Sequence, residues 1–98
     1  MILYNVTVSL DASIHTDWLE WMRNVHIPEV MATGYFVEHK ICKLLVDDEI
    51  TYAIQYNCET LEKLNEYQEK YSPALQQKHT ERYKGKFGAF RTLLEIIE

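Results

Sequence analysis

The chain has 98 residues, which is enough for one domain around one hydrophobic core. Hydrophobic residues make up 47% and charged residues 26%, which excludes a disordered or fibrous chain. The net charge of −5 disfavours a nucleic-acid partner, because phosphate binding needs clustered cations.

The sequence shows neither a membrane-spanning segment nor a secretory signal. No apolar run approaches the roughly 18–20 residues that cross a bilayer, and the first residues show no basic leader region. Cys42 and Cys58 are typical of free thiols in a reducing compartment rather than of a disulfide scaffold. We therefore expect a cytoplasmic protein with no membrane partner.

Residues 2–10 alternate between apolar and mixed positions. This period of two, with its β-branched side chains, predicts a half-buried strand. The apolar face carries Ile2, Tyr4, Val6, Val8 and Leu10.

Residues 11–33 are predicted to be helical, with Asp11 or Ser13 as the cap. Five apolar side chains fall on one stripe and should face the core. They are Ile14, Trp18, Trp21, Met22 and Val25. Pro28 predicts a kink or restart near Ile27, and Gly34 should end the helix.

Residues 35–46 and 49–57 are predicted to form a hairpin around Asp47-Asp48. If Val46 faces Glu49, paired residue numbers sum to 95. Ile41 then lies opposite Ile54, on a face that is mostly large and apolar, while the other face is mixed and polar.

The last third of the chain predicts two helical segments and a strand. Leu61, Leu64, Gln68 and Tyr71 recur at helical spacing, and Ser72-Pro73 then starts a segment that runs to about Lys84. Its inner face carries Leu75, His79 and Tyr83. Gly85 should end it, and residues 87–97 should form the final strand.

The order of the elements is β-α-β-β-α-β. It predicts an α+β, ferredoxin-like fold over residues 1–98, with a four-stranded antiparallel sheet and the helices on one face.

The other face of this sheet should be open. We expect it to carry Leu3, Asn5, Thr7, Phe36, Glu38, Lys40, Cys42, Leu44, Thr51, Ala53, Gln55, Arg91, Leu93 and Ile97. This set is too apolar to stay wet and too polar for a second core, which favours a homodimer through the open face. A solvated face on a monomer is the alternative.

The four histidines do not show the spacing of a metal site, so we predict no metal and no cofactor. His26 precedes Ile27-Pro28, where its ring N–H could satisfy a carbonyl freed by the kink; a catalytic role is the alternative. The chain has no nucleophile signature and no phosphate-binding glycine motif.

Several segments together resemble one known family. They are Tyr4-Asn5-Val6-Thr7, Trp18-Leu19-Glu20-Trp21-Met22, His26-Ile27-Pro28, Thr33-Gly34-Tyr35-Phe36, Thr51-Tyr52-Ala53-Ile54-Gln55-Tyr56 and Phe90-Arg91-Thr92. They look like a family of small uncharacterised bacterial proteins, a domain of unknown function grouped with the dimeric α/β barrels. The resemblance implies that fold and a back-to-back dimer, and it implies no reaction.

The wider superfamily includes monooxygenases, haem-degrading enzymes and small-ligand-binding regulators. Its haem-degrading members use an Asn on the first strand and a His and a Trp from the second half. Asn5 and His79 resemble two of these residues, but this chain has no Trp after Trp21.

These observations leave three hypotheses of function. The first is a small-molecule pocket at the barrel interior, with Asn5, Thr7, Gln55, Arg91 and His26 as the candidate ligand-binding residues. The second is a non-catalytic structural or regulatory dimer. The third, weaker one is a monooxygenase-like or haem-binding protein.

Overall fold

The computed structural model describes residues 1–98. Its strands are β1 (Ile2–Leu10), β2 (Phe36–Lys43), β3 (Ile50–Cys58) and β4 (Phe87–Glu95). Its helices are α1 (His15–Trp21), α2 (Ile27–Ala32), α3 (Leu61–Lys70) and α4 (Ser72–Tyr83), with a short 3₁₀ turn, η1 (Ala12–Ile14), before α1 and a π-helical turn, η2 (Met22–His26), between α1 and α2.

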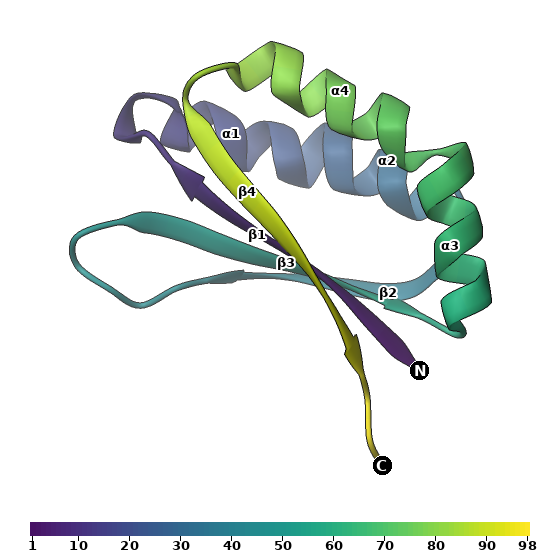
Figure 1. Ribbon diagram of the computed structural model, residues 1–98. Coiled ribbons are helices and arrows are strands. Elements are labelled where there is room, and N and C mark those ends of the chain that lie inside the picture. Colours follow the sequence, from purple (N-terminus) through teal and green to yellow (C-terminus); the bar gives the residue numbers. More distant parts are fainter.

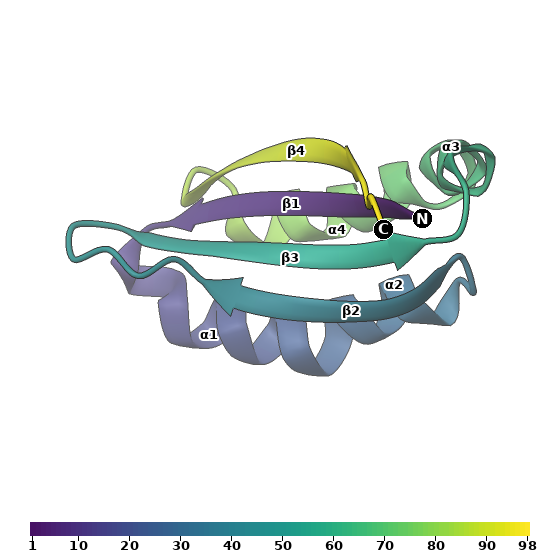
Figure 2. The ribbon, with the colours of Figure 1, turned by 90° about the horizontal axis from the view of Figure 1, so that it is seen from below.

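The four strands form one antiparallel sheet in the order β2-β3-β1-β4. All the helices lie on one side of this sheet (Figure 1), and the view from below shows its other face without helices (Figure 2). The predicted ferredoxin-like α+β fold is confirmed. None of the helices has the length and apolar character needed to span a bilayer.

The core lies between the sheet and the helices. It contains sixteen buried side chains, among them Tyr4 and Val8 of β1 and Ile54 of β3, as the period of two predicts. Trp18 of α1 and Leu64 of α3 are fully buried against them. Cys58 is buried, Cys42 is exposed, and both are free thiols.

The cap predicted at Asp11 is confirmed and Thr60 caps α3, whereas Ser72, at the start of α4, makes no capping hydrogen bond. Asp11 accepts a hydrogen bond from the Ser13 backbone N–H, and Thr60 accepts one from the backbone N–H of Lys63. Gly34 and Gly85 follow helix ends with φ of 82° and 78°, a region that favours glycine.

The predicted hairpin register is confirmed from Glu38↔Asn57 to Lys43↔Tyr52. The strands are shorter than expected, because β2 ends at Lys43 and β3 begins at Ile50. The Leu44 backbone N–H still donates to the Thr51 carbonyl, but residues 45–49 form no further strand pairing.

The prediction for Phe36 is wrong. A bulge between Phe36 and Glu38 adds one residue, so that Phe36 pairs with Cys58 and turns to the helix side. There it is 6% exposed and its ring lies 4.8 Å from that of Tyr67, while Val37 is 54% exposed.

The predicted face of β4 is also wrong. Arg91 pairs with Val6 and Leu93 pairs with Tyr4, so both lie on the helix side, and Ile97 lies beyond the end of β4. Paired residues of antiparallel strands share a face, so the open face receives Phe90, Thr92 and Leu94 instead. Apolar residues occupy both faces of this edge strand, so its alternation does not determine which face turns toward the helices.

The first helical stretch restarts at Ile27 with Pro28 in its first turn, as predicted. The restart follows the π-helical turn η2, which holds one more residue than an α-helical turn and rotates the stripe. Val25 is therefore 40% exposed, contrary to prediction, whereas Ile27 and Val30 are buried.

In α3 the buried side chains are Leu64 and Tyr67, and the predicted Leu61 and Tyr71 are exposed. In α4 the predicted inner face is confirmed, with Leu75, His79 and Tyr83 all buried.

The bulge can be tested by truncation at its two neighbouring residues. Phe36→Ala should lower the free energy of unfolding by about 3–5 kcal/mol, because it empties a site in the aromatic core. Val37→Ala should change it by no more than about 0.5 kcal/mol, because that side chain is exposed. Urea unfolding measures both, and equal effects would contradict the bulged register.

Candidate functional site

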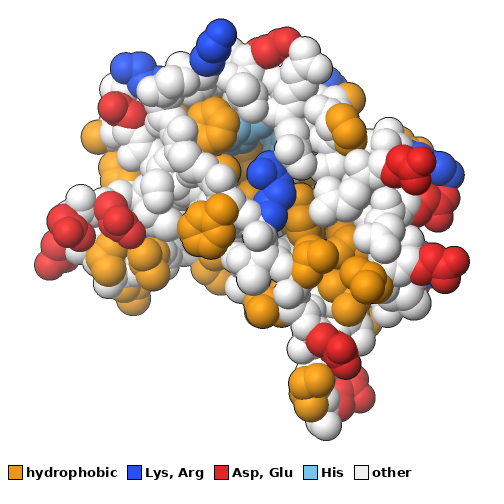
Figure 3. Space-filling view, viewed as in Figure 1, with side chains coloured by type: hydrophobic (Ala, Val, Ile, Leu, Met, Phe, Trp, Pro, Cys, Tyr) orange, Lys and Arg blue, Asp and Glu red, His pale blue; other side chains and the backbone are white.

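A cavity of about 170 Å³ lies between the helix side of the sheet and the helices. Most of its wall is apolar and comes from β1, β3, β4, α2 and α4. Its polar side chains include His26, His79, Gln76, Thr80 and Arg91. In Figure 3 a cationic side chain borders a hollow in which histidine is visible at depth.

His79 forms one wall of the cavity and is 8% exposed. The Trp18 indole N–H donates a hydrogen bond of 2.8 Å to its Nε2 atom. Because the indole is only a donor, Nε2 must be the unprotonated nitrogen, so the ring is neutral with its proton on Nδ1. The hydrogen bond joins α1 to α4 beneath the surface.

His26 enters the cavity because η2 ends at this residue. Its ring stacks on Trp21 with 5.0 Å between centroids and lies 5.9 Å from the ring of His79. Its Nδ1 atom is buried and has no hydrogen-bond partner. The expected bond from this ring nitrogen to a freed backbone carbonyl is therefore not formed.

Burial lowers the pKa of both histidines from 6.5 to about 4. The positive charge of Arg91 lowers both values further, and His26 also lowers that of His79. The carboxylate of Glu29 opposes the shift of His26 without cancelling it. Both rings are neutral at pH 7 and can donate or accept hydrogen bonds.

Arg91 is the only Lys or Arg residue that lines the cavity, and the lining includes no Asp or Glu. Its Nε atom donates to the Tyr4 hydroxyl at 3.1 Å, which holds the side chain along the sheet. None of the four ion pairs of the chain involves Arg91. The cavity therefore carries one positive charge without a carboxylate counterion.

Two tyrosines add hydroxyl groups to the cavity wall. Burial raises the pKa of both Tyr56 and Tyr67, so that their hydroxyls stay protonated and uncharged at neutral pH. Beside them the Gln76 amide donates to the buried Ser72 hydroxyl at 2.6 Å.

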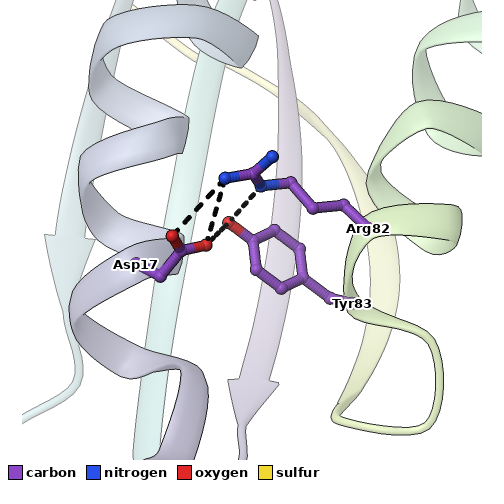
Figure 4. A network of polar contacts seen from close by, with 3 residues as sticks. All are labelled: Asp17, Arg82 and Tyr83. Carbon is purple, nitrogen blue, oxygen red and sulfur yellow. Dashed lines mark hydrogen bonds and ion pairs between the residues drawn. The ribbon is translucent and has the colours of Figure 1, made fainter.

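A surface network fastens α1 to the end of α4 (Figure 4). The Tyr83 hydroxyl donates to Asp17 at 2.8 Å, and the Arg82 guanidinium contacts both oxygens of the same carboxylate at 3.3 and 3.4 Å. Arg82 also lies over the Trp21 ring, 5.4 Å from its centroid. These contacts hold Trp21, and hence His26, against the cavity.

The five candidate residues separate into two groups. Asn5, Thr7 and Gln55 lie on the open face, where the Asn5 amide donates to the Thr7 hydroxyl at 3.1 Å and accepts from Gln55 at 3.3 Å. His26 and Arg91 lie on the opposite side of the sheet, in the cavity. The structure does not bring the two groups together.

The sequence reasoning did not include His79 and Tyr67 among the ligand-binding candidates. The spacing of His79 from Leu75 predicted its place on the inner helix face, but an inward position does not distinguish a cavity residue from a core residue. Tyr67 gave no such signal, because Gln68 was expected on the stripe instead.

The residues do not fit a haem or a metal ion at this site. Nε2 of His79 is occupied by Trp18, and Asn5 lies on the other face of the sheet. A cavity of about 170 Å³ is also too small for a porphyrin, since it is close to one of about 150 Å³ that holds benzene. No group of three or more His, Cys, Asp or Glu side chains is arranged to hold a metal ion.

The chain belongs to the family described as "Domain of unknown function (DUF4286)", whose model matches residues 1–97. This confirms the resemblance to an uncharacterised family. No curated protein matches the chain in sequence.

Solved structures share the fold at low sequence identity. A dimeric ferredoxin-like protein from an uncultured marine organism is 12% identical with a TM-score of 0.74, over 100% of this chain and 96% of its own. A protein from Deinococcus radiodurans, provisionally named an antibiotic biosynthesis monooxygenase, is 15% identical with a TM-score of 0.70, over 100% and 94%. An ethyl tert-butyl ether D (EthD) family protein from Bacillus halodurans is 12% identical with a TM-score of 0.68, over 99% and 100%.

The neutral histidines predict a pH dependence of stability. In the unfolded chain these rings bind protons below about pH 6.5, but in the folded protein only near pH 4, so acid favours unfolding. Stability should fall as the pH drops from 6.5 to 4, by about 3 kcal/mol for each ring, because one pKa unit corresponds to about 1.4 kcal/mol.

Thermal unfolding followed by circular dichroism tests this prediction. His26→Phe keeps the stacking on Trp21 and should weaken the pH dependence between 6.5 and 4 by about half, because His79 remains. His39→Phe changes an exposed ring of β2 and should leave the dependence unchanged. A wild-type melting temperature that is level over this range would contradict the buried neutral state.

Proposed function

We propose that this chain is a small-molecule-binding protein whose ligand occupies the cavity between the sheet and the helices. The observation that carries the proposal is the buried Nδ1 atom of His26, which lacks a hydrogen-bond partner and belongs to a ring that lines this cavity. A buried polar atom without a hydrogen bond costs about 1–3 kcal/mol, so folded proteins rarely keep one without a use.

The shape of the cavity supports the same proposal. Ligand sites are concave and mostly apolar, with a few polar groups that fix orientation. Here apolar side chains such as Val8, Ile54 and Leu75 form the wall, while His26 and Arg91 supply the polar groups. A pocket for a ligand explains why Nδ1 of His26 and the Nη atoms of Arg91 have no partner within the chain.

The proposal includes a homodimer through the open face. Phe90 is 62% exposed on that face and Leu94 is 45% exposed, beside the small side chains of Thr7 and Ala53. Small side chains let two sheets approach to about 10 Å. A structure with the same fold is described as a dimeric ferredoxin-like protein, which supports this arrangement.

In this proposal the hydrogen bonds among Asn5, Thr7 and Gln55 serve the interface. These side chains already satisfy one another within one chain, so burying them against a second sheet costs less than burying free polar groups. A structural or regulatory dimer without a ligand is the competing function, and occupancy of the cavity distinguishes the two.

Occupancy can be tested with toluene as an apolar probe. A titration followed by NMR should shift the Met22 methyl and the Trp18 indole N–H signals, because Met22 lines the cavity and Trp18 contacts its wall. Ala89→Phe projects a ring into the cavity from β4 and should abolish the shifts, whereas Ala74→Phe, at an exposed position of α4, should preserve them. Native mass spectrometry of freshly purified protein should detect any carried ligand.

Unchanged signals at saturating toluene would argue for the structural dimer. Equal shifts in Ala89→Phe and Ala74→Phe would place the probe elsewhere and would also contradict a ligand in this cavity.

The dimer can be tested at Ala53, in the middle of the open face. Ala53→Arg should yield a folded monomer, because an unpaired charge in a dry interface costs several kcal/mol (roughly 3–5). Ala74→Arg should remain dimeric. Light scattering gives the mass and circular dichroism the fold; a dimeric Ala53→Arg protein would show that the sheets do not meet there.

A further inference from the structure

We infer that the ligand of this cavity is a small monocyclic acid with one negative charge, whose carboxylate binds Arg91 and whose hydroxyl group meets Nδ1 of His26. The inference rests on the proposed function and adds the chemical class of the ligand. It follows from the charge of the cavity, from its size, and from the unpartnered Nδ1 atom of His26 and Nη atoms of Arg91.

The charge of the cavity selects an anion. Arg91 is its only cationic side chain, no carboxylate lines it, and only the Nε atom of the guanidinium is bonded, to Tyr4. The two Nη atoms therefore keep their N–H groups for a ligand, and a guanidinium matches a planar carboxylate with two parallel hydrogen bonds.

The number of charges selects a monoanion. His26 and His79 are neutral at pH 7 because burial lowers the pKa of each to about 4. Arg91 then supplies a single positive charge, which one carboxylate neutralises. A phosphate monoester would bring a second negative charge into a wall that is mostly apolar and holds no second cation.

The size of the cavity selects a single ring. Its volume of about 170 Å³ is slightly larger than that of a cavity known to hold benzene, about 150 Å³. One six-membered ring fills such a space between Val8, Ile54 and Leu75, and the carboxylate reaches the guanidinium on the exposed edge strand β4.

The unpartnered Nδ1 atom of His26 favours a ligand with a second polar group, a hydroxyl. The stack on Trp21 fixes the plane of its ring, and the π-helical turn fixes its backbone, so Nδ1 has a defined direction. A π-helical turn is rare and is frequent at functional sites. A hydroxyl group both donates and accepts, so it can satisfy Nδ1 in either tautomer.

Isothermal titration calorimetry with four probes tests the inference: 3-hydroxybenzoate, 4-hydroxybenzoate, benzoate and the neutral 4-hydroxybenzyl alcohol. At least one hydroxybenzoate should bind about tenfold or more tightly than the alcohol, since hydrogen bonds to a charged group are the stronger ones. Arg91→Met keeps the aliphatic stem and should remove this preference. Lys86→Met, which removes a cation outside the cavity, should retain it.

His26→Phe separates the second polar contact from the first. It should remove the preference for hydroxybenzoate over benzoate and leave the preference for benzoate over toluene intact. The Ala89→Phe variant should bind none of the acids, which ties the signal to the cavity.

Two outcomes would overturn the inference. One is an alcohol that binds as tightly as the acids; the other is an Arg91→Met variant with unchanged affinity for them. Either result leaves the proposed function standing if toluene still enters the cavity. Failure of toluene and of all four probes would overturn both.

Discussion

The hydrogen bond from the Trp18 indole to His79 holds together the layer on which the cavity depends. Both groups are buried, and each would carry a large cost without the other. Their bond sets the spacing of α1 and α4 over the sheet and fixes the tautomer of the imidazole. Trp21, His26 and Tyr83 then pack around that ring at centroid distances of 5.4–5.9 Å. The candidate site is thus a product of helix packing, which orients its polar groups within the chain alone.

Local signals were strong enough to predict most of the fold. Alternation in β1, capping at Asp11 and Thr60, and the glycines at helix ends each act within a few residues, and all appear in the structure. The hairpin register was predictable because one face is buried, and a slip would expose it. Two features that escaped prediction each add one residue: the bulge before Glu38 and the π-helical turn η2. Such insertions are stabilised by tertiary packing, which a linear pattern does not contain.

The candidate site was harder to predict, for a related reason. Polar residues on a strand, such as Asn5 and Gln55, stand out in a sequence because they interrupt an apolar pattern. The cavity is instead lined mainly by apolar residues that a sequence pattern assigns to the core. Its distinctive groups are His26, at the end of the π-helical turn η2, and Arg91, on a strand with apolar residues on both faces. Arg91 was selected as a polar residue of the open face, and that assignment of its face was wrong. Its position became clear only from the pairing with Val6.

The bulge in β2 also affects how copies of this protein can meet. β2 is an outer strand of the sheet, and its free backbone N–H and C=O groups could recruit another strand and begin a fibril. The bulge breaks the regular spacing of those groups, and the exposed charges of Glu38, Lys40 and Lys43 surround what remains. Continuous sheets running from molecule to molecule are therefore disfavoured along this border, whereas the proposed contact through the broad face of the sheet closes after two copies.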